Sequence, residues 1–446
     1  FKYLKADGKY QSIFIPDNLN KIDDVSLNLS LNGKLNNFNS NYTISSDYGN
    51  INGQLLINEN QDSVITYDLK IKADKLAGEL ISEKLNVDYF NANLNIKGIG
   101  LESNDLDLII DGSLSDLKYN NYIYEDVSIN GSLKNQSFNG DISLSDKLID
   151  LVFKGDLDLN KNPYEFDFTL NVNHAFLNDL GLVDNALNPK ISFNSKATGT
   201  GSSLDNFTGD IDFTEINYFE NDNKYFFDSL NIYSFSNDKE HQVTLLSKFF
   251  TFDMVGNYHF DHFSNDLNSY LSIFIPNVFD SPSNMDHKEE NIHIQAKIND
   301  VSLLSDLFFP HLRIANQSTI DLDFSKNKKY ADLSISSNFI EYYGFLFNDI
   351  RVLSKNNNSF IDSIFNLSIE LSDITDNNLV NCNNVNIITS VHNNQLELEL
   401  NWDNKDSLNS GNFNMSAFFN SKDSIDLNLE KGVFKSKALG ESKWSD

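Results

Sequence analysis

Apolar and polar residues alternate in short runs along almost the whole chain. Between residues 25 and 31, for example, Val25, Leu27, Leu29 and Leu31 alternate with serine and asparagine. Because successive side chains of a β-strand point to opposite faces, this pattern predicts strands with one apolar and one polar face. The alternation recurs as far as Leu429, which predicts a mainly β protein: an elongated, curved antiparallel sheet with a few short helices.

A polar residue followed by glycine interrupts many of the apolar runs. Asn32-Gly33, Asn52-Gly53, Asn130-Gly131 and Asn139-Gly140 carry this signal. Glycine inside a strand pattern usually marks a bulge or a bend, and Asn-Gly is a common hairpin turn. We therefore expect hairpins or bulges at these positions and a sheet that is curved at intervals.

Helical spacing of apolar residues is confined to three brief segments, 76–85, 175–189 and 301–310, and the last two end at a proline. Residues 280–291, with Pro282 and a charged run, read as a loop or linker. The helix-then-strand order around 175 and 301 divides one continuous repetitive β segment, 1–446, into approximate sub-modules 1–174, 175–298 and 299–446.

The excess of acidic over basic residues bears on which kinds of molecule the chain could bind. The chain has 446 residues, with 34 Lys+Arg against 64 Asp+Glu, and a formal net charge of −30 at pH 7. It lacks the basic footprint that binding a phosphate backbone requires, so we expect no nucleic-acid partner. Hydrophobic residues make up 40% of the chain, too many for a disordered acidic segment.

No targeting or anchoring segment is visible in the sequence. The chain begins at Phe1 and stops shortly after an incoming strand pattern, so we expect an internal piece of a longer protein.

Candidate chemistry is sparse. His259 and His262, the closest histidine pair, would lie on opposite faces of a strand, and His287 and His293 flank the charged loop as exposed titrating residues. The single cysteine, Cys382, excludes an intramolecular disulfide. Nucleophile-elbow, P-loop and dinucleotide motifs are missing from the sequence. We expect no enzyme activity, no catalytic residue, no metal site and no cofactor.

The order and spacing of several segments point to a known family. They are the run 91–160 with Lys97-Gly98-Ile99-Gly100, the tyrosines at 119, 122 and 124 and the strand 127–131, together with segments 175–189, 303–310 and 400–402. In these segments the chain resembles the AsmA-like/TamB family of translocation and assembly module proteins. The resemblance spans most of the chain and rests on no single motif.

This resemblance implies an elongated, taco-shaped sheet (a β-taco) with a continuous apolar groove in the periplasm of a diderm bacterium. In the full-length protein it would be tethered to the inner membrane, through an anchor that this sequence lacks. Members are thought to carry phospholipids between the inner and outer membranes and to support outer-membrane assembly. Phospholipid is then the expected ligand, and an outer-membrane assembly factor, bound through regions missing here, the expected partner.

The inward alternate positions are the expected lining of the lipid groove. They are Leu27, Leu29, Leu31, Leu106, Leu108, Ile110, Ile142, Leu144, Leu157, Leu159, Phe166, Phe168, Leu170, Ile211, Phe213, Ile320, Leu322, Phe324, Leu396, Leu398 and Leu400.

Two other classes share the alternating pattern. An outer-membrane β-barrel fragment should have strands of about ten residues and aromatic girdles at both ends, whereas the runs here are mostly shorter. A passive β-solenoid or adhesin-like structural protein would fill its interior with its own side chains.

Overall fold

A computed structural model describes most of the chain. The described residues are 25–34, 36–60, 64–80, 87–100, 106–120, 122–183, 187–221, 223–237, 239–279, 291–325, 330–354, 364–376, 381–405, 409–436 and 440–445. They fall into two compact units. Unit 1 contains the residues up to Ser202 together with Ile211–Asp228, and unit 2 contains Ser203–Asp210 and Ser229–Asp446. The three sub-modules expected from the sequence stay a prediction.

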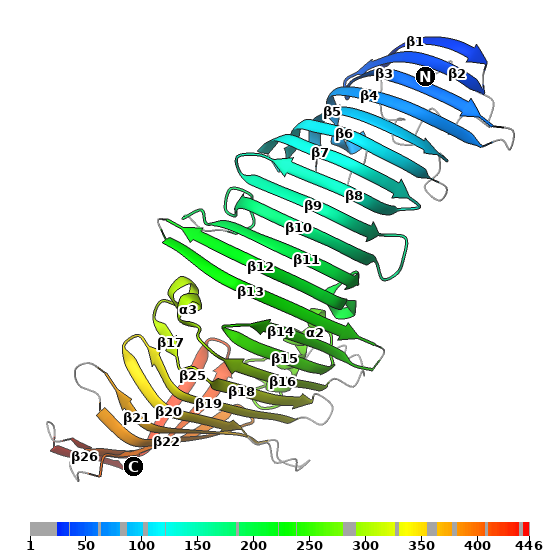
Figure 1. The fold of residues 1–446 in the computed structure, drawn as a ribbon. Coiled ribbons are helices and arrows are strands. Elements are labelled where there is room, and N and C mark those ends of the chain that lie inside the picture. Colours follow the sequence, from blue (N-terminus) through cyan, green and yellow to red (C-terminus); the bar gives the residue numbers. More distant parts are fainter. Residues whose placement is uncertain are drawn as a thin grey trace. The chain divides into compact units, whose positions relative to one another are not determined.

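Unit 1 is built almost entirely of strands (Figure 1). They are β1 (Val25–Lys34), β2 (Asn37–Ser46), β3 (Gly49–Glu59), β4 (Ile65–Ala77), β5 (Val87–Ile99), β6 (Asp107–Tyr119), β7 (Tyr122–Lys134), β8 (Ser137–Ser145), β9 (Ile149–Asp158), β10 (Glu165–Phe176), β11 (Lys190–Thr200) and most of β12 (Thr208–Glu220). A short 3-10 helix, η2 (Gly78–Leu80), follows β4.

Unit 2 combines strands with α2 (Phe260–Leu271), α3 (Ser302–Phe308) and the 3-10 helix η4 (Leu204–Asn206). Its strands are the second half of β13 (Asn223–Ser236), β14 (His241–Ser247), β15 (Phe250–Asn257), β16 (Asn291–Ile298), β17 (Leu312–Ile314), β18 (Ser318–Ser325), β19 (Tyr330–Tyr342), β20 (Phe345–Ser354), β21 (Phe365–Thr375), β22 (Asn381–His392), β23 (Gln395–Asp403), β24 (Ser410–Ser421), β25 (Ser424–Ser436) and β26 (Gly440–Ser445).

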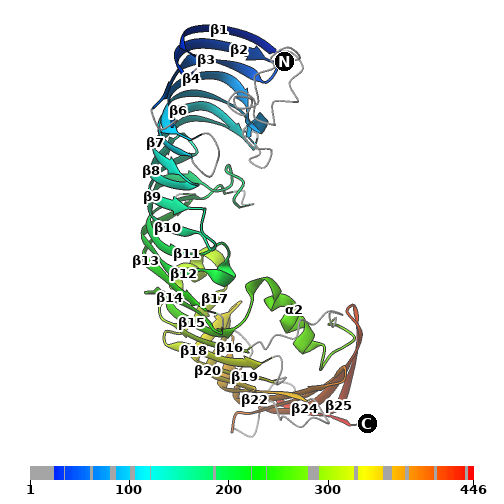
Figure 2. The ribbon, with the colours of Figure 1, turned by 90° about the vertical axis from the view of Figure 1, so that its right-hand side faces the viewer.

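Neighbouring strands within each unit are antiparallel and follow one another in the chain. In unit 1 this meander runs from β1 to β11. In unit 2 it departs from sequence order only where β17 and β18 lie end to end along β19, and β18 pairs with β16. The strands curve along their length (Figure 2). The expected mainly β fold, an open and curved antiparallel sheet with few helices, is confirmed.

The glycines inside the apolar runs lie within strands and not in turns. The expectation of hairpins or bulges at these positions is wrong. Strand pairing continues without a shift through Gly33, Gly131 and Gly155. Register shifts instead occur at bulges such as 73–76 and 172–175. Two-residue hairpin turns are made by pairs such as Asn393-Asn394, whose φ angles of 47° and 66° suit the twist of the flanking strands.

Helical spacing predicts only one of the observed α-helices. The segment 301–310 contains α3, as expected. The described residues of the segment 175–189 form no helix, because β10 continues to Phe176 and a turn follows, and residues 184–186 lie outside the described residues. Within 76–85, the described residues extend β4 to Ala77 and form only the 3-10 helix η2, and 81–86 lie outside the described residues. Of the expected loop 280–291, only Asn291 is described, and it begins β16.

The helix α2, which begins directly after His259, is not among the helices expected from the sequence. His259 and His262 therefore do not lie on the two faces of a strand. No helix among the described residues is long and apolar enough to cross a membrane.

Candidate apolar binding surface

Strand register places the apolar alternate positions of unit 1 on one face. Leu27 lies opposite Ile44, which lies opposite Ile51, and each strand in turn continues the row. The row comprises Leu27, Ile44, Ile51, Ala73, Ala92, Leu114, Val127, Leu144, Leu151, Val172 and Phe193, from β1 to β11. Parallel rows run through Leu29, Leu31 and Leu108. We call this side of the sheet the apolar face of unit 1.

Most of the expected lining residues of unit 1 lie on this apolar face. They are Leu27, Leu29, Leu31, Leu108, Ile110, Ile142, Leu144, Leu157, Phe166, Phe168 and Leu170. Leu106 and Leu159 lie just beyond the ends of β6 and β9. Phe213 of β12 reaches the same face, because its ring centroid lies 5.5 Å from that of Phe193, and Ile211 precedes it by two residues on the same strand.

The apolar face is more sheltered than the opposite face but is not closed. Val127 and Ala73 are buried, whereas Ile109, on the opposite face of β6, is 62% exposed. On β1, however, which pairs with β2 among the described strands, Leu27, Leu29 and Leu31 keep 44%, 46% and 47% of their surface exposed. This much exposed aliphatic surface along one strand is a candidate binding surface.

Aromatic rings lie over glycines on this face. An added Cβ at Gly131 would lie 2.9 Å from Cε2 of the Phe138 ring, and one at Gly98 would lie 2.9 Å from the Tyr67 hydroxyl oxygen. The Phe168 ring is 5.1 Å from that of Phe153, which is 6.4 Å from Phe138 on the next strand. Glycine thus leaves room for large side chains to lie flat on the sheet, which keeps the aromatic surface continuous from β8 to β10.

The opposite face of unit 1 is a solvated, charged surface. Cross-strand ion pairs join Lys97 to Asp68 at 3.0 Å and Lys134 to Asp107 at 2.8 Å. Exposed pairs of this kind contribute roughly 0–1 kcal/mol each, so they support the register without dominating stability.

Unit 2 has an equivalent apolar face. Phe324 of β18 lies opposite Ile292 of β16, and Leu322 lies between Ile294 and Leu333. Ile320, Leu322 and Phe324 share this face, and Leu396, Leu398 and Leu400 share a face of β23 with Ala417 and Met415 of β24.

Part of the unit 2 face is covered by the chain itself. Residues 260–279, which we call the strap, comprise α2 and the turns that follow it, and they lie on the concave side of this sheet (Figure 2). The Tyr270 ring contacts that of Phe324 at 5.2 Å, and the Phe274 ring contacts that of Phe365 at 5.6 Å. Val391 and Leu396 pack in the same cluster. Two expected lining residues, Phe324 and Leu396, are therefore contacted by protein.

Hydrogen bonds fix the far end of the strap to the β22–β23 turn. The Asn394 N–H donates to the Phe274 carbonyl oxygen at 2.8 Å, and the Asn277 N–H donates to Asn394 Oδ1 at 2.7 Å. Asn277 Nδ2 also donates to the Phe419 carbonyl oxygen at 2.8 Å. The strap thus crosses from β18 to β24. The spacing of Leu267, Tyr270, Leu271 and Phe274 is the sequence signal that could have revealed this apolar helical stripe.

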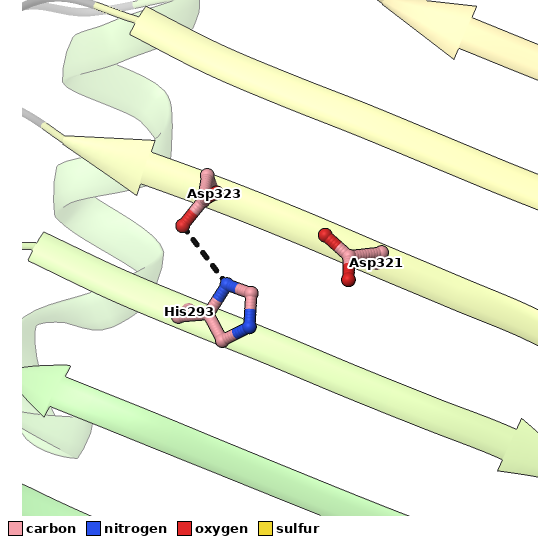
Figure 3. Close-up of side chains that lie close together, drawn as sticks. All are labelled: His293, Asp321 and Asp323. Atoms are coloured by element: carbon pink, nitrogen blue, oxygen red, sulfur yellow. Dashed lines mark hydrogen bonds and ion pairs between the residues drawn. The ribbon is translucent and has the colours of Figure 1, made fainter.

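One group of side chains on the polar face of unit 2 has the composition of a cation site. His293 Nδ1 lies 2.9 Å from Asp323 Oδ1, with Asp321 beside them, and the three donor atoms lie within 4.8 Å of one another (Figure 3). Asp321 accepts a hydrogen bond from Gln295 at 2.9 Å. Each group therefore already has a cross-strand partner on an accessible strand surface, and we assign the group to strand pairing.

Two buried polar side chains stabilise the scaffold. Asp146, at the β8–β9 turn, accepts hydrogen bonds from the Tyr122 hydroxyl at 2.5 Å and the Leu148 N–H at 2.9 Å. Burial acts to raise the pKa of Asp146, but these hydrogen bonds and one from the Glu125 N–H outweigh it and lower the pKa. Burial lowers the pKa of His241, whose Nε2 lies 3.0 Å from Ser234 Oγ.

Comparisons with protein-family models, curated proteins and solved structures find no match to this chain. The resemblance to the AsmA-like/TamB family stays a prediction.

Proposed function

We propose that this protein is a periplasmic lipid carrier whose apolar face shields phospholipid acyl chains during transport between the inner and outer membranes. The observation that carries the proposal is the apolar row that continues from β1 to β11 on one face of unit 1, where Leu27, Leu29 and Leu31 are exposed. The proposal assigns the chain a binding role and no catalytic step. Support of outer-membrane assembly, through an assembly factor that contacts other regions, belongs to the same proposal.

The energetics favour an acyl chain as the occupant. Each methylene removed from water gains about 0.8 kcal/mol, without any specific contact. Neighbouring positions along the rows offer similar aliphatic and aromatic surface, so a bound chain meets no deep energy well and can move from strand to strand. The acidic character of the chain, at −30, keeps a sheet with such an apolar face dispersed in water.

Lipid analysis tests the proposal. Residues 1–446 are expressed in the bacterial periplasm, purified without detergent and extracted for lipid mass spectrometry, with a soluble β-sandwich of unrelated sequence as control. We expect several phospholipid molecules per chain. A lipid-free chain would contradict the proposal and favour the passive structural alternative, in which the apolar face is covered by protein.

A further inference from the structure

The strap encloses space on the apolar face of unit 2. A cavity of about 150 Å³ lies between α2 and the sheet. Leu267, Tyr270 and Leu271 form its strap side, and Ile292, Leu322 and Leu333 form its sheet side. The cavity therefore combines the expected lining residue Leu322 with a roof that is supplied by the same chain.

Two of the described residues that line the cavity, Ser354 and Tyr270, carry hydroxyls, and both hydroxyls have backbone partners. The Ser354 Oγ donates its hydrogen to the Ala331 carbonyl oxygen at 3.0 Å, and the Tyr270 hydroxyl is hydrogen-bonded to the Ala331 backbone. The other described lining residues, including Phe324 and Phe365, present aliphatic or aromatic carbon. An apolar cavity without polar partners does not hold water stably and accepts an apolar ligand instead.

The size of the cavity limits the ligand. A dry cavity of this volume accepts a hydrocarbon of about six carbon atoms, as benzene-binding cavities of the same size do. That is the end of one acyl chain and not a head group. An entry lies at Leu267, which lines the cavity and keeps 42% of its surface exposed.

We propose that the cavity beneath the strap is a binding site for the terminal segment of a single acyl chain. This inference rests on the proposed function, because it assigns to unit 2 a site, partly covered by the strap, for the ligand that the open face of unit 1 would shield. The site differs from that face in holding one chain end at a fixed depth.

Photolabelling of the full chain tests the site. The probe is dodecanoic acid with a diazirine at its methyl end, and the labelled peptides are identified by mass spectrometry. We expect labelling of strap and sheet peptides around Leu271 and Leu333. Leu333→Phe, which fills the cavity, should reduce this labelling by at least about tenfold. Leu353→Phe is the matched control, since Leu353 is exposed on the strand that carries Ser354.

The outcomes separate this inference from the proposed function. Labels on unit 1 with none in the cavity would overturn the site and leave the carrier proposal standing. Labels in the cavity with none on unit 1 would support the site and overturn the proposal that the unit 1 face carries lipid. Cavity labelling that persists in Leu333→Phe would overturn the site, and labels in neither place would overturn both. Leu322→Phe fills the cavity from the neighbouring strand and replaces Leu333→Phe if that variant does not fold.

Discussion

The backbone N–H of Asn394 donates a hydrogen bond of 2.8 Å to the carbonyl oxygen of Phe274. Asn394 is buried in the β22–β23 turn with a φ angle of 66°, and Phe274 lies in the strap. This contact therefore joins segments that are 120 residues apart in the chain (394 − 274). The Asn394 side chain completes the link through Oδ1 to Asn277. The β22–β23 turn therefore helps to hold the strap over the apolar face of unit 2, together with the aromatic contacts.

Asn394→Gly should loosen the strap. Glycine keeps the positive φ without strain but removes the acceptor for the Asn277 N–H, a loss of about 1–3 kcal/mol for a buried group. We expect faster amide hydrogen exchange across residues 273–279. Asn394→Asp retains an acceptor oxygen and serves as the control. Unchanged exchange in the glycine variant would show that the aromatic contacts alone hold the strap.

Gly411→Ala should displace the Trp402 ring. Trp402 lies over Gly411, where an added Cβ would clash with the indole, and the Trp402 and Phe413 rings stack at 5.7 Å. Overpacking of this kind costs about 1–3 kcal/mol, measurable by urea unfolding. In a Trp402→Leu background the same substitution should cost much less. Equal costs in both backgrounds would refute the proposed contact.

Asp146→Asn should lower stability at neutral pH by about 2 kcal/mol, because the amide cannot accept the hydrogen bonds that reach both carboxylate oxygens. The folded-state pKa of Asp146 is lowered, so its contribution is present above the unfolded pKa of about 3.9 and is lost as pH falls through the folded value. Below the folded-state pKa, the free energies of unfolding of the parent protein and of Asp146→Asn should therefore converge.

The matched control for Asp146 is Asp141→Asn, since Asp141 is exposed and pairs with Lys154 at 3.4 Å. We expect a change below about 1 kcal/mol at every pH. Parallel urea-unfolding curves for Asp146→Asn and the parent protein between pH 3 and pH 7 would count against the carboxylate as the stabilising form.

His241 should make unit 2 less stable in mild acid. Burial depresses the folded-state pKa, so the unfolded chain binds the proton first and stability falls as pH drops below about 6.5, by at most about 1.4 kcal/mol per pH unit. Ser234 lies at Nε2 and Tyr258 stacks on the ring at 5.0 Å, while Asp205 acts to raise the pKa of His241 and His259 acts to lower it.

In His241→Gln this part of the pH dependence should disappear, whereas His392→Gln, at an exposed position, should retain it. Thermal unfolding at pH 5, 6 and 7 gives the comparison. If His241→Gln and the parent protein lose stability in parallel over this range, the dependence arises elsewhere.

Carboxylates placed on the apolar face of unit 1 should interrupt lipid binding. Leu108→Asp combined with Phe168→Asp places two carboxylates among the apolar rows, and we expect about a tenfold loss of phospholipid transfer between donor and acceptor vesicles. The double variant Ile109→Asp/Thr169→Asp changes neighbouring residues on the opposite face of the same strands and should transfer normally. Equal transfer by both double variants would count against the carrier proposal.

Alternation alone predicted the fold class and the sidedness of the strands. The period of two is a local property, so Leu27, Leu29 and Leu31 could be assigned to one face before their partners were known. The same reasoning failed at glycine. In the sequence, the position of Gly155 inside an apolar run suggests a bulge. In the structure, Gly155 lies opposite Phe168 of the adjacent strand, and the local sequence pattern cannot identify that partner.

Alternation in the sequence places leucines, isoleucines and phenylalanines on one side of the unit 1 strands and charges on the other. Contacts in the folded chain set which part of that apolar surface stays accessible. Leu31 of β1 is 47% exposed, whereas Phe324, from an equivalent alternating run, is buried beneath Tyr270. The reason is that burial depends on contacts between residues far apart in the chain, here set by a hydrogen-bonded turn at Asn394, and alternation carries no information about such contacts.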